Sequence, residues 1–238
     1  MAVFVISDTH LSLGKADKPM DIFGDKWAGH AEKIRRNWLE AIGPEDTVVI
    51  PGDISWALKT EDSLDDTRFL DALPGRKIIG KGNHDYWWGT CTKMRAFLRD
   101  NGIGTIEFLY NNAFRADGLI ICGSRLWDGV GTNSAPEDLK AYAREVGRLR
   151  TSLLAGTALR ETEGGEIAAF THYPPWASND GRQEYMELLA EFGVKRCYYG
   201  HLHGPAIASA VEGECRGVEL RLVSADHLDF VPLKISAY

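Results

Sequence analysis

Seven side chains able to bind metal ions, with one further histidine beside them, fall in five short blocks of this sequence. The blocks are Asp8-Thr9-His10, Gly52-Asp53, Gly82-Asn83-His84-Asp85, His172 and Gly200-His201-Leu202-His203. Two carboxylates, one amide and four imidazoles make a mixed oxygen and nitrogen donor set, which suits Mn, Fe, Zn, Co or Ni better than Ca. If these side chains converge, they would hold two divalent metal ions, and His84 would be left free for proton transfer.

The spacing within two of the blocks indicates how their side chains could converge. Asp8 and His10 are two residues apart, and in an extended conformation both would point to the same side. His201 and His203 bracket a leucine in the same way. Either pair could therefore reach one site, although a polar turn is an equally good explanation of the first block taken alone.

The other three blocks differ in how much they predict. Asp53 follows a glycine that permits a tight exposing turn, but Gly-Asp turns are common. Asn83 offers a neutral oxygen ligand, the adjacent His84 points elsewhere, and Asp85 could orient the His84 ring. His172 alone predicts least, because a lone histidine is usually a hydrogen-bonded structural residue.

Short apolar runs precede most blocks and predict the strands that position them. Strands are expected at Ala2–Ile6, Thr47–Ile50, Lys77–Ile79, Ile167–Thr171 and Cys197–Tyr199, and helices at residues 30–42, Glu61–Leu73, Cys91–Arg99 and Gln183–Phe192. This alternation favours parallel strands joined by helical crossovers. The blocks would then lie on loops at one edge of the sheets.

The remaining segments predict mixed rather than purely parallel sheets. Ile106–Tyr110 and Phe114–Arg115 are typical of a hairpin that leads to a strand at Leu119–Cys122. Ser134 to Glu137 fits a capping box that begins a helix ending near residue 155. The C-terminal runs Ala206–Val211, Val218–Val223 and Leu228–Ile235 are expected to be antiparallel strands, because the turns between them are short. The predicted fold is an α/β domain of two mixed β-sheets with outer helices.

The ordered series D-x-H, G-D, G-N-H-D, H and G-H-x-H, which runs from residue 8 to residue 203, resembles the calcineurin-like metallophosphoesterases. The text from Lys81 to Trp88 also resembles a predicted bacterial phosphohydrolase subgroup. The resemblance implies a four-layer αββα sandwich of two mixed β-sheets, with the metal site on loops at one edge. Five ordered motifs in strand-end contexts are far more specific than any one of them.

The resemblance also implies a role for each residue. Asp8, His10 and His203 would hold one metal ion, Asn83, His172 and His201 the other, and Asp53 would bridge both. A hydroxide shared by the two ions would attack phosphorus, His84 would protonate the leaving group, and Asp85 would hold the His84 ring. We therefore expect a metal-dependent phosphoric ester hydrolase.

Composition narrows the choice of substrate. The formal charge of −7 makes binding to long nucleic acid an unlikely use of this surface, because such binding relies on Lys and Arg. A small or medium phosphoester is expected, and a nucleotide stays open. The motif blocks hold no Lys/Arg cluster, which slightly favours a phosphodiester over a phosphomonoester. A nuclease, a protein Ser/Thr phosphatase and a non-catalytic interaction module of the same fold are the alternatives.

The four cysteines are scattered, and no apolar run reaches membrane-spanning length. Reduced thiols and a cytoplasmic location are expected, with no membrane partner. No linker or repeat divides the chain, so residues 1–238 are predicted to form a single domain. The sequence predicts neither the oligomeric state nor which metals are bound.

Two segments are expected to lie around the site. Residues 11–29 form a long loop that could act as a lid. Arg125 could bind a substrate phosphate, although a salt bridge is the stronger expectation for it. Four tryptophans lie close to the blocks, at Trp56, Trp87, Trp88 and Trp176; packing beneath the motif loops is favoured over stacking on a nucleobase.

Overall fold

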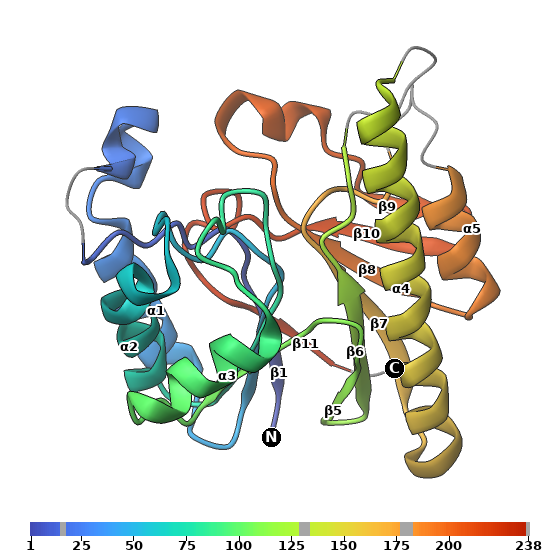
Figure 1. The fold of residues 1–238 in the computed structure, drawn as a ribbon, viewed down its shortest axis with the longest axis horizontal. Helices are drawn as coiled ribbons and strands as arrows, with labels where there is room; N and C mark the ends of the chain where they lie inside the picture. Colours follow the sequence, from blue (N-terminus) through green and yellow to red (C-terminus); the bar gives the residue numbers. More distant parts are fainter. Residues whose placement is uncertain (15–17, 129–133, 177–182, 237–238) are drawn as a thin grey trace.

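Two mixed β-sheets lie face to face in the computed structural model, which describes residues 1–14, 18–128, 134–176 and 183–236 (Figure 1). The first sheet, in the order β11-β1-β2-β3-β4, is made of β1 (Val3–Val5), β2 (Thr47–Ile50), β3 (Arg76–Ile79), β4 (Ile106–Phe108) and β11 (Leu233–Ile235). The second, in the order β5-β6-β7-β8-β10-β9, is made of β5 (Phe114–Ala116), β6 (Leu119–Ser124), β7 (Glu166–Thr171), β8 (Arg196–Tyr199), β9 (Gly213–Cys215) and β10 (Val218–Leu222).

Parallel strands fill the middle of each sheet, and antiparallel strands lie at every edge except that of β4. Strands β1, β2, β3 and β4 run parallel, with β11 antiparallel to β1. Strands β6, β7, β8 and β10 also run parallel, with β5 and β9 antiparallel at the two edges. The carboxyl ends of the parallel strands therefore gather at one edge of the sandwich.

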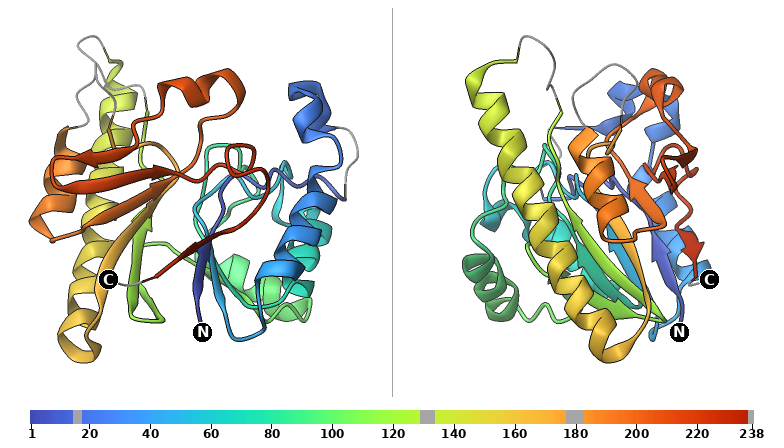
Figure 2. Two further views of the ribbon diagram at one scale, coloured as in Figure 1. Left: turned by 180° about the vertical axis from the view of Figure 1, so that it is seen from behind. Right: turned by 90° about the vertical axis from the view of Figure 1, so that its right-hand side faces the viewer.

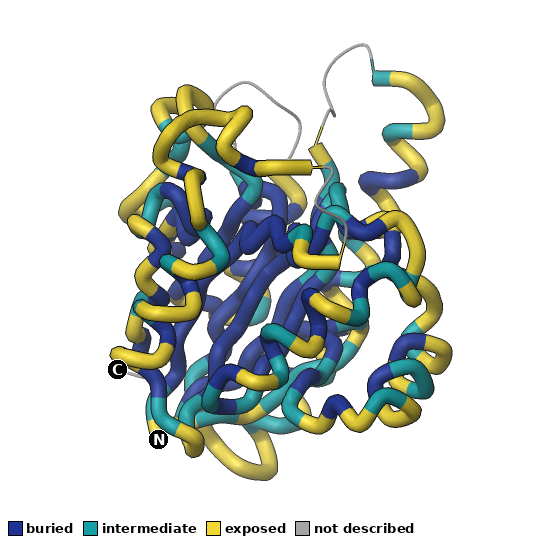
Figure 3. The backbone as a smooth tube through the Cα atoms, turned by 90° about the vertical axis from the view of Figure 1, so that its left-hand side faces the viewer, coloured by how far each residue is buried: buried dark blue, intermediate teal, exposed yellow. Residues whose placement is uncertain are grey.

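Helices cover the outer face of each sheet, which completes the predicted four-layer αββα sandwich (Figures 1 and 2). Helices α1 (His30–Ala41), α2 (Leu64–Ala72) and α3 (Cys91–Asp100) pack on the first sheet, and α4 (Pro136–Glu163) and α5 (Gln183–Glu191) pack on the second. Strands β1, β2 and β8 are buried along their whole length, and the buried strands lie at the centre of the molecule (Figure 3).

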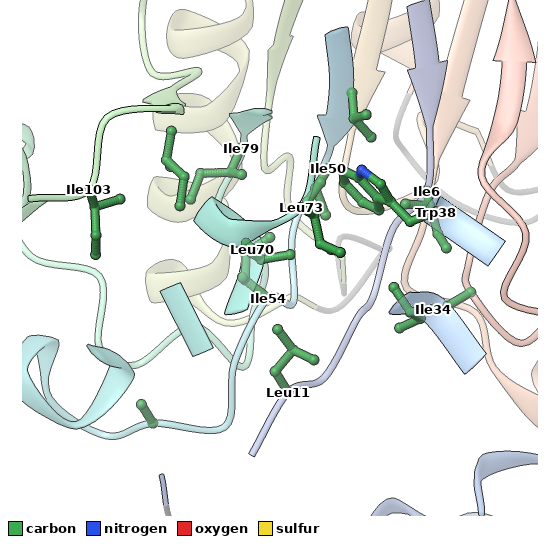
Figure 4. Close-up of a cluster of buried hydrophobic side chains, with 14 of the residues drawn as sticks. Ile6, Leu11, Ile34, Trp38, Ile50, Ile54, Leu70, Leu73, Ile79 and Ile103 are labelled. Atoms are coloured by element: carbon green, nitrogen blue, oxygen red, sulfur yellow. The ribbon is translucent and has the colours of Figure 1, made fainter. Parts of the chain in front are cut away.

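The N-terminal strand is covered on both faces, which explains its unbroken apolar run. Val3 and Val5 face the second sheet, in a core that also holds Phe170, whereas Phe4 and Ile6 face the helices. The helix-side core includes Trp38 and Leu70 (Figure 4). A strand covered on both faces cannot alternate polar and apolar residues, so the run is apolar throughout.

The hairpin expected from residues 106–115 is wrong. Strand β4 pairs in parallel with β3 in the first sheet, and β5 pairs with β6 in the second. Asn111 takes a left-handed φ of 56°, and the side chain of Asn112 accepts the backbone N–H of Tyr110 at 2.7 Å. The two asparagines do form a turn, but it carries the chain from one sheet to the other.

Two predictions about the C-terminal third are also corrected. Gly204–Ser209 is a 3-10 helix, η4, rather than part of a strand. Pro205 explains this, because proline has no N–H for a β ladder and suits the first turn of a helix. The expected antiparallel pairing holds for β9 with β10, and β11 pairs antiparallel with β1 in the first sheet. Strand β10 also runs parallel to β8, since the connection through η4 and β9 is long enough for a crossover.

The start of α4 differs from the predicted capping box. Its N-cap is Ala135, with Pro136 in the first turn, and no side chain caps the helix. The helix also continues to Glu163.

Within the described residues, no helix is both long enough and apolar enough to cross a membrane. All four cysteines are free, as expected.

Candidate metal centre

Three of the predicted ligands form one tight group at the edge where the parallel strands end. The carboxylate of Asp8 lies 3.1 Å from Nε2 of His203, which lies 3.3 Å from Nε2 of His10. The donor atoms of these three residues all lie within 4.8 Å of one another. Residues from opposite ends of the chain thus meet as predicted.

A second group forms beside the first. Oδ1 of Asn83 lies 2.6 Å from Nε2 of His172 and 3.0 Å from Nδ1 of His201. His172 comes from the end of β7, and His201 follows β8. All three are the residues that the sequence predicted to act together.

Asp53 lies between the two groups. Its Oδ2 is 3.7 Å from Nε2 of His10 and 3.5 Å from Nε2 of His172. Its Oδ1 accepts the backbone N–H of His84 at 2.8 Å. One carboxylate therefore faces a donor from each group, which is the arrangement required of a bridging ligand.

The backbone conformation that brings these side chains together was not predicted from the sequence. Asp8, His10, Asp53 and His201 all have positive φ angles, of 61°, 43°, 51° and 72°. Extended alternation of Asp8 with His10 is therefore wrong, because both residues lie beyond β1 in left-handed turns. Non-glycine residues rarely adopt such angles, and they cluster where function requires an unusual side-chain direction.

Two glycines in the blocks are required by close approach. A Cβ on Gly82 would collide with the carboxylate and backbone of Asp53, and a Cβ on Gly200 would collide with Asp8 and Ser7. Ser7 also bridges Ser224, which joins the first sheet to the second at the site. These glycines let both sheets close around the carboxylates.

Sequence reasoning missed Asp226. Its Oδ1 lies 2.9 Å from Nδ1 of His203, which leaves Nε2 of that ring facing Asp8. A partner that takes one ring N–H fixes the other nitrogen as a metal donor. Its position in the sequence could have identified Asp226, since it follows β10 as the other ligands follow their strands.

Asp85 does not hold the His84 ring, which corrects the predicted role. Its two oxygens accept the backbone N–H groups of Asp53 (2.9 Å), Ile54 (2.9 Å) and Gly82 (2.7 Å), together with further N–H donors on Ser55 and Trp87. The His84 ring is not among these partners, and its Nδ1 is buried without one. Asp85 instead ties the loop of Asp53 to the loop of Asn83.

The charges of this cluster fit a cation. Burial raises the pKa of Asp53 well above its usual value, and the Asp8 and Asp85 carboxylates raise it further. Burial lowers the pKa of His172 to about 3 and that of His10 well below its usual value, so both rings are neutral. The Nδ1 atoms of both rings are buried without a hydrogen-bond partner. Buried carboxylates beside neutral imidazoles suit divalent metal ions.

Protons partly compensate the charge in the metal-free protein. Burial opposes protonation of His203, but Asp8 and Asp226 outweigh it and raise its pKa to about 10. Burial alone would raise the pKa of Asp8, yet His203 and the other imidazoles lower it below its usual range. Metal binding would displace the proton from His203 and make binding pH-dependent.

His84 lies at the edge of the cluster, beside an aromatic surface. Its ring centroid is 4.5 Å from that of Trp56 and 5.8 Å from that of His10. Burial and the neighbouring His201 lower its pKa. Its ring also borders a cavity that His10 and His203 share, so it is placed to exchange a proton with a molecule bound there.

Arg125 and His84 line different cavities. Its guanidinium is 3.7 Å from the buried carboxylate of Glu145, which also pairs with Arg148. Lys81 lines the same small cavity as these residues, and His84 does not. The salt bridge favoured for Arg125 is thus present.

The segment from Leu11 to Gly29 lies over the first group of ligands. Its described part contains two 3-10 helices, η1 (Met20–Phe23) and η2 (Asp25–Trp27). The ring of Trp27 lies 5.5 Å from that of His203. Trp87 and Trp88 are buried beneath the motif loop, as the packing interpretation expected, whereas Trp56 faces the cavity.

Comparisons with known proteins agree with this geometry. The family model described as calcineurin-like phosphoesterase matches residues 1–205. The Gene 66 protein of Mycobacterium phage D29 is 39% identical over 85 residues, which are 35% of this chain and 40% of the phage protein. The matched part thus spans less than half of that relative.

Two solved structures are similar in fold. The phosphopantetheinyl hydrolase of Mycobacterium tuberculosis has a TM-score of 0.53 at 16% identity, covering 94% of this chain and 88% of its own. The protein TT1561 of Thermus thermophilus has a TM-score of 0.50 at 13% identity, covering 84% of this chain and 81% of its own. At these identities the likeness extends to the fold alone.

Proposed function

This chain belongs to the calcineurin-like phosphoesterase family and is a metal-dependent phosphoesterase; we propose that it hydrolyses a small or medium phosphodiester at a centre of two divalent ions. The observation that carries the proposal is the position of Asp53, whose Oδ2 lies 3.7 Å from His10 and 3.5 Å from His172. A single carboxylate between two donor groups is suited to two ions rather than one.

The proposed ligands divide into two sets around Asp53. Asp8, His10 and His203 would hold one ion, and Asn83, His172 and His201 would hold the other. When bound, the two ions supply Lewis acidity towards the phosphoryl oxygens and a nucleophile formed from water at neutral pH. The mixture of nitrogen and oxygen donors suits Mn, Fe, Zn, Co or Ni.

The chain itself supplies the proton and the surroundings. His84 protonates the leaving oxygen, because its ring borders the cavity beside the cluster. Burial lowers the pKa of His84 in the free protein, and a nearby phosphate anion would raise that pKa again by favouring the imidazolium. The rings of Trp27 and Trp56 line the same cavity as His84.

A diester is favoured over a monoester by the charges beside His84. Among the described residues that line the cavity next to it, none is a lysine or an arginine. A monoester dianion would call for extra cations there. Monoester hydrolysis remains the second candidate, because Lys81 and Arg125 lie near the other side of the cluster.

Reconstitution with Mn²⁺ tests the proposal. Hydrolysis of bis-p-nitrophenyl phosphate and of p-nitrophenyl phosphate is measured as metal is added, together with the number of ions bound. The proposal expects about two ions per chain and faster turnover of the diester. A preference for the monoester would replace the first candidate by the second, and binding of metal without hydrolysis of either ester would contradict both.

A further inference from the structure

A cavity of about 230 Å³ opens beside His84, on the side of the cluster that holds His10 and His203. Its lining comes from the metal cluster, the segment over it, Trp56 and the start of η4: His10, Met20, Phe23, Trp27, Trp56, His84, His203, Gly204 and Pro205. We call it the leaving-group pocket. It is continuous with the metal centre because three of its walls are histidines of the cluster.

Apart from those histidines, the walls of the pocket are apolar and mostly aromatic. The rings of Phe23 and Trp56 are nearly parallel, with centroids 6.4 Å apart and an interplanar angle of 5°. Nε1 of Trp56 donates to Sδ of Met20 at 3.0 Å, which fixes the indole. Phe23 is 61% exposed, so its ring is accessible to a molecule bound in the pocket.

The proposed reaction places the leaving group in this pocket. His84 must contact the oxygen that leaves, and its ring is part of the pocket wall. The rest of the leaving group then extends from that oxygen between Trp56, Phe23 and Trp27. The pocket is therefore suited to select what is attached to the scissile oxygen.

Its size and charge restrict that group. A cavity of about 150 Å³ lined by apolar side chains is large enough to hold benzene, so 230 Å³ accommodates one substituted or fused ring. None of the described lining residues is Lys, Arg, Asp or Glu. Lys18 lies over the Trp56 ring at 4.6 Å but is not part of the lining. A charged leaving group would lose its hydration there without a partner.

The geometry points to a phosphoester whose leaving group is a single uncharged, planar ring system, held against Phe23 and Trp56. This inference rests on the proposed function and adds the chemical class of the leaving group. Aromatic contacts of this kind contribute about 0.5–1.5 kcal/mol beyond area burial, which corresponds to roughly a 2- to 12-fold effect on kcat/KM.

Two diesters that differ only in the leaving group test it. Methyl p-nitrophenyl phosphate loses an aryl group, and methyl 2,2,2-trifluoroethyl phosphate loses a small non-aromatic one. Intrinsic reactivity differs between the two esters, but it cancels when a variant is compared with the parent protein on each ester separately.

Phe23→Ala is the informative variant, because Phe23 contacts no metal ligand in the arrangement described above. Ile22→Ala is its matched control, since Ile22 lies on the same 3-10 helix, is 71% exposed and does not line the pocket. We expect Phe23→Ala to lower kcat/KM for the aryl ester by roughly 3- to 10-fold. The trifluoroethyl ester should be unaffected, and Ile22→Ala should leave both esters unchanged.

The outcomes separate this inference from the function beneath it. An equal effect of Phe23→Ala on both esters, or no effect on either, would overturn the leaving-group pocket while the hydrolase remained. Failure of the parent protein to hydrolyse either ester with Mn²⁺ would overturn the proposed function, and the inference with it. A selective loss confined to the aryl ester would support both.

Discussion

The carboxylate of Asp85 accepts the backbone N–H of Asp53 at 2.9 Å. Through this hydrogen bond, Asp85 holds the loop that carries Asp53. The carboxylate of Asp53 lies between the two groups of metal donors. The same oxygen accepts the N–H of Gly82 at 2.7 Å, in the loop that carries Asn83. The spacing of the two loops, and with it the distance between Asp53 and Asn83, depends on one buried side chain.

Asp85→Asn should therefore destabilise the fold and loosen metal binding. The new amide N–H₂ would face N–H donors, and at least one buried donor would lose its acceptor. We expect the free energy of unfolding to fall by about 2–4 kcal/mol, measured by urea denaturation. Asp100→Asn, at an exposed position on α3, is the control. A stable variant with only a shifted pH profile of turnover would instead restore the role of Asp85 as a partner of His84.

His84→Ala should remove catalysis and spare metal binding. Its ring borders the cavity, and its atoms are not among the grouped donor atoms of the cluster. Loss of a general acid lowers turnover by about 100- to 10,000-fold. Hydrolysis of methyl 2,2,2-trifluoroethyl phosphate, whose alkoxide leaving group needs a proton, is measured with bound metal on the same sample. His227→Ala is the control, because His227 pairs with Glu212 at 3.7 Å. Normal turnover in His84→Ala would exclude this proton donor.

Asp226→Asn should weaken metal binding through His203. The amide cannot hold the Nδ1–H of His203 as the carboxylate does at 2.9 Å. Replacing such a partner typically lowers metal affinity by about 10- to 100-fold, which a competition titration with a chelator measures. Asp229→Asn is the matched control, since its carboxylate pairs with Lys26 at the surface. Equal affinities in the two variants would show that Asp226 does not orient the ligand.

Lys77 predicts a rise of stability at alkaline pH. Burial lowers its pKa from 10.5 to about 8. Between these values the unfolded chain binds more protons than the folded one, so the free energy of unfolding rises with pH across the window from about 8 to 10.5. The cost of burying the charged form of Lys77, which disappears as the side chain loses its proton, is roughly 3 kcal/mol.

Lys77→Met isolates this contribution, because cysteines and tyrosines also titrate at alkaline pH. The difference in unfolding free energy, parent minus variant, should grow more positive by roughly 3 kcal/mol from pH 7 to pH 11. Urea denaturation at a series of pH values measures it. A difference that stays constant would mean that Lys77 keeps its ordinary pKa in the fold.

Much of the architecture and the convergence of the candidate metal donors could be predicted, for a physical reason. Strands covered on both faces require unbroken apolar runs, and metals accept few side-chain types, so both leave marks in local sequence. Val3–Val5 and the block at Asn83 are examples. The parallel pairing of β10 with β8 could not be predicted, because it depends on how a long connection crosses the sheet.

The parts of the site that could not be predicted from the sequence depend on backbone geometry and on isolated residues. Nothing in the residue types of Asp8 and His10 predicts positive φ angles, which result from packing between the sheets. Asp226 stands alone after β10, without a neighbouring ligand to mark it. Asp85 was identified, but three of its partners are backbone N–H groups 30–32 residues away, and sequence carries no record of them.

The most direct test of the metal centre is hydrolysis of bis-p-nitrophenyl phosphate by the Mn²⁺-reconstituted protein and by Asp53→Asn. The substitution keeps the shape of the side chain and removes the charge between the two donor groups. We predict metal-dependent hydrolysis that falls by at least about 100-fold in the variant, because even partners outside the ligand set alter activity by 10- to 100-fold. Equal hydrolysis by both proteins, or a parent protein that binds no Mn²⁺, would contradict a two-metal centre bridged by Asp53.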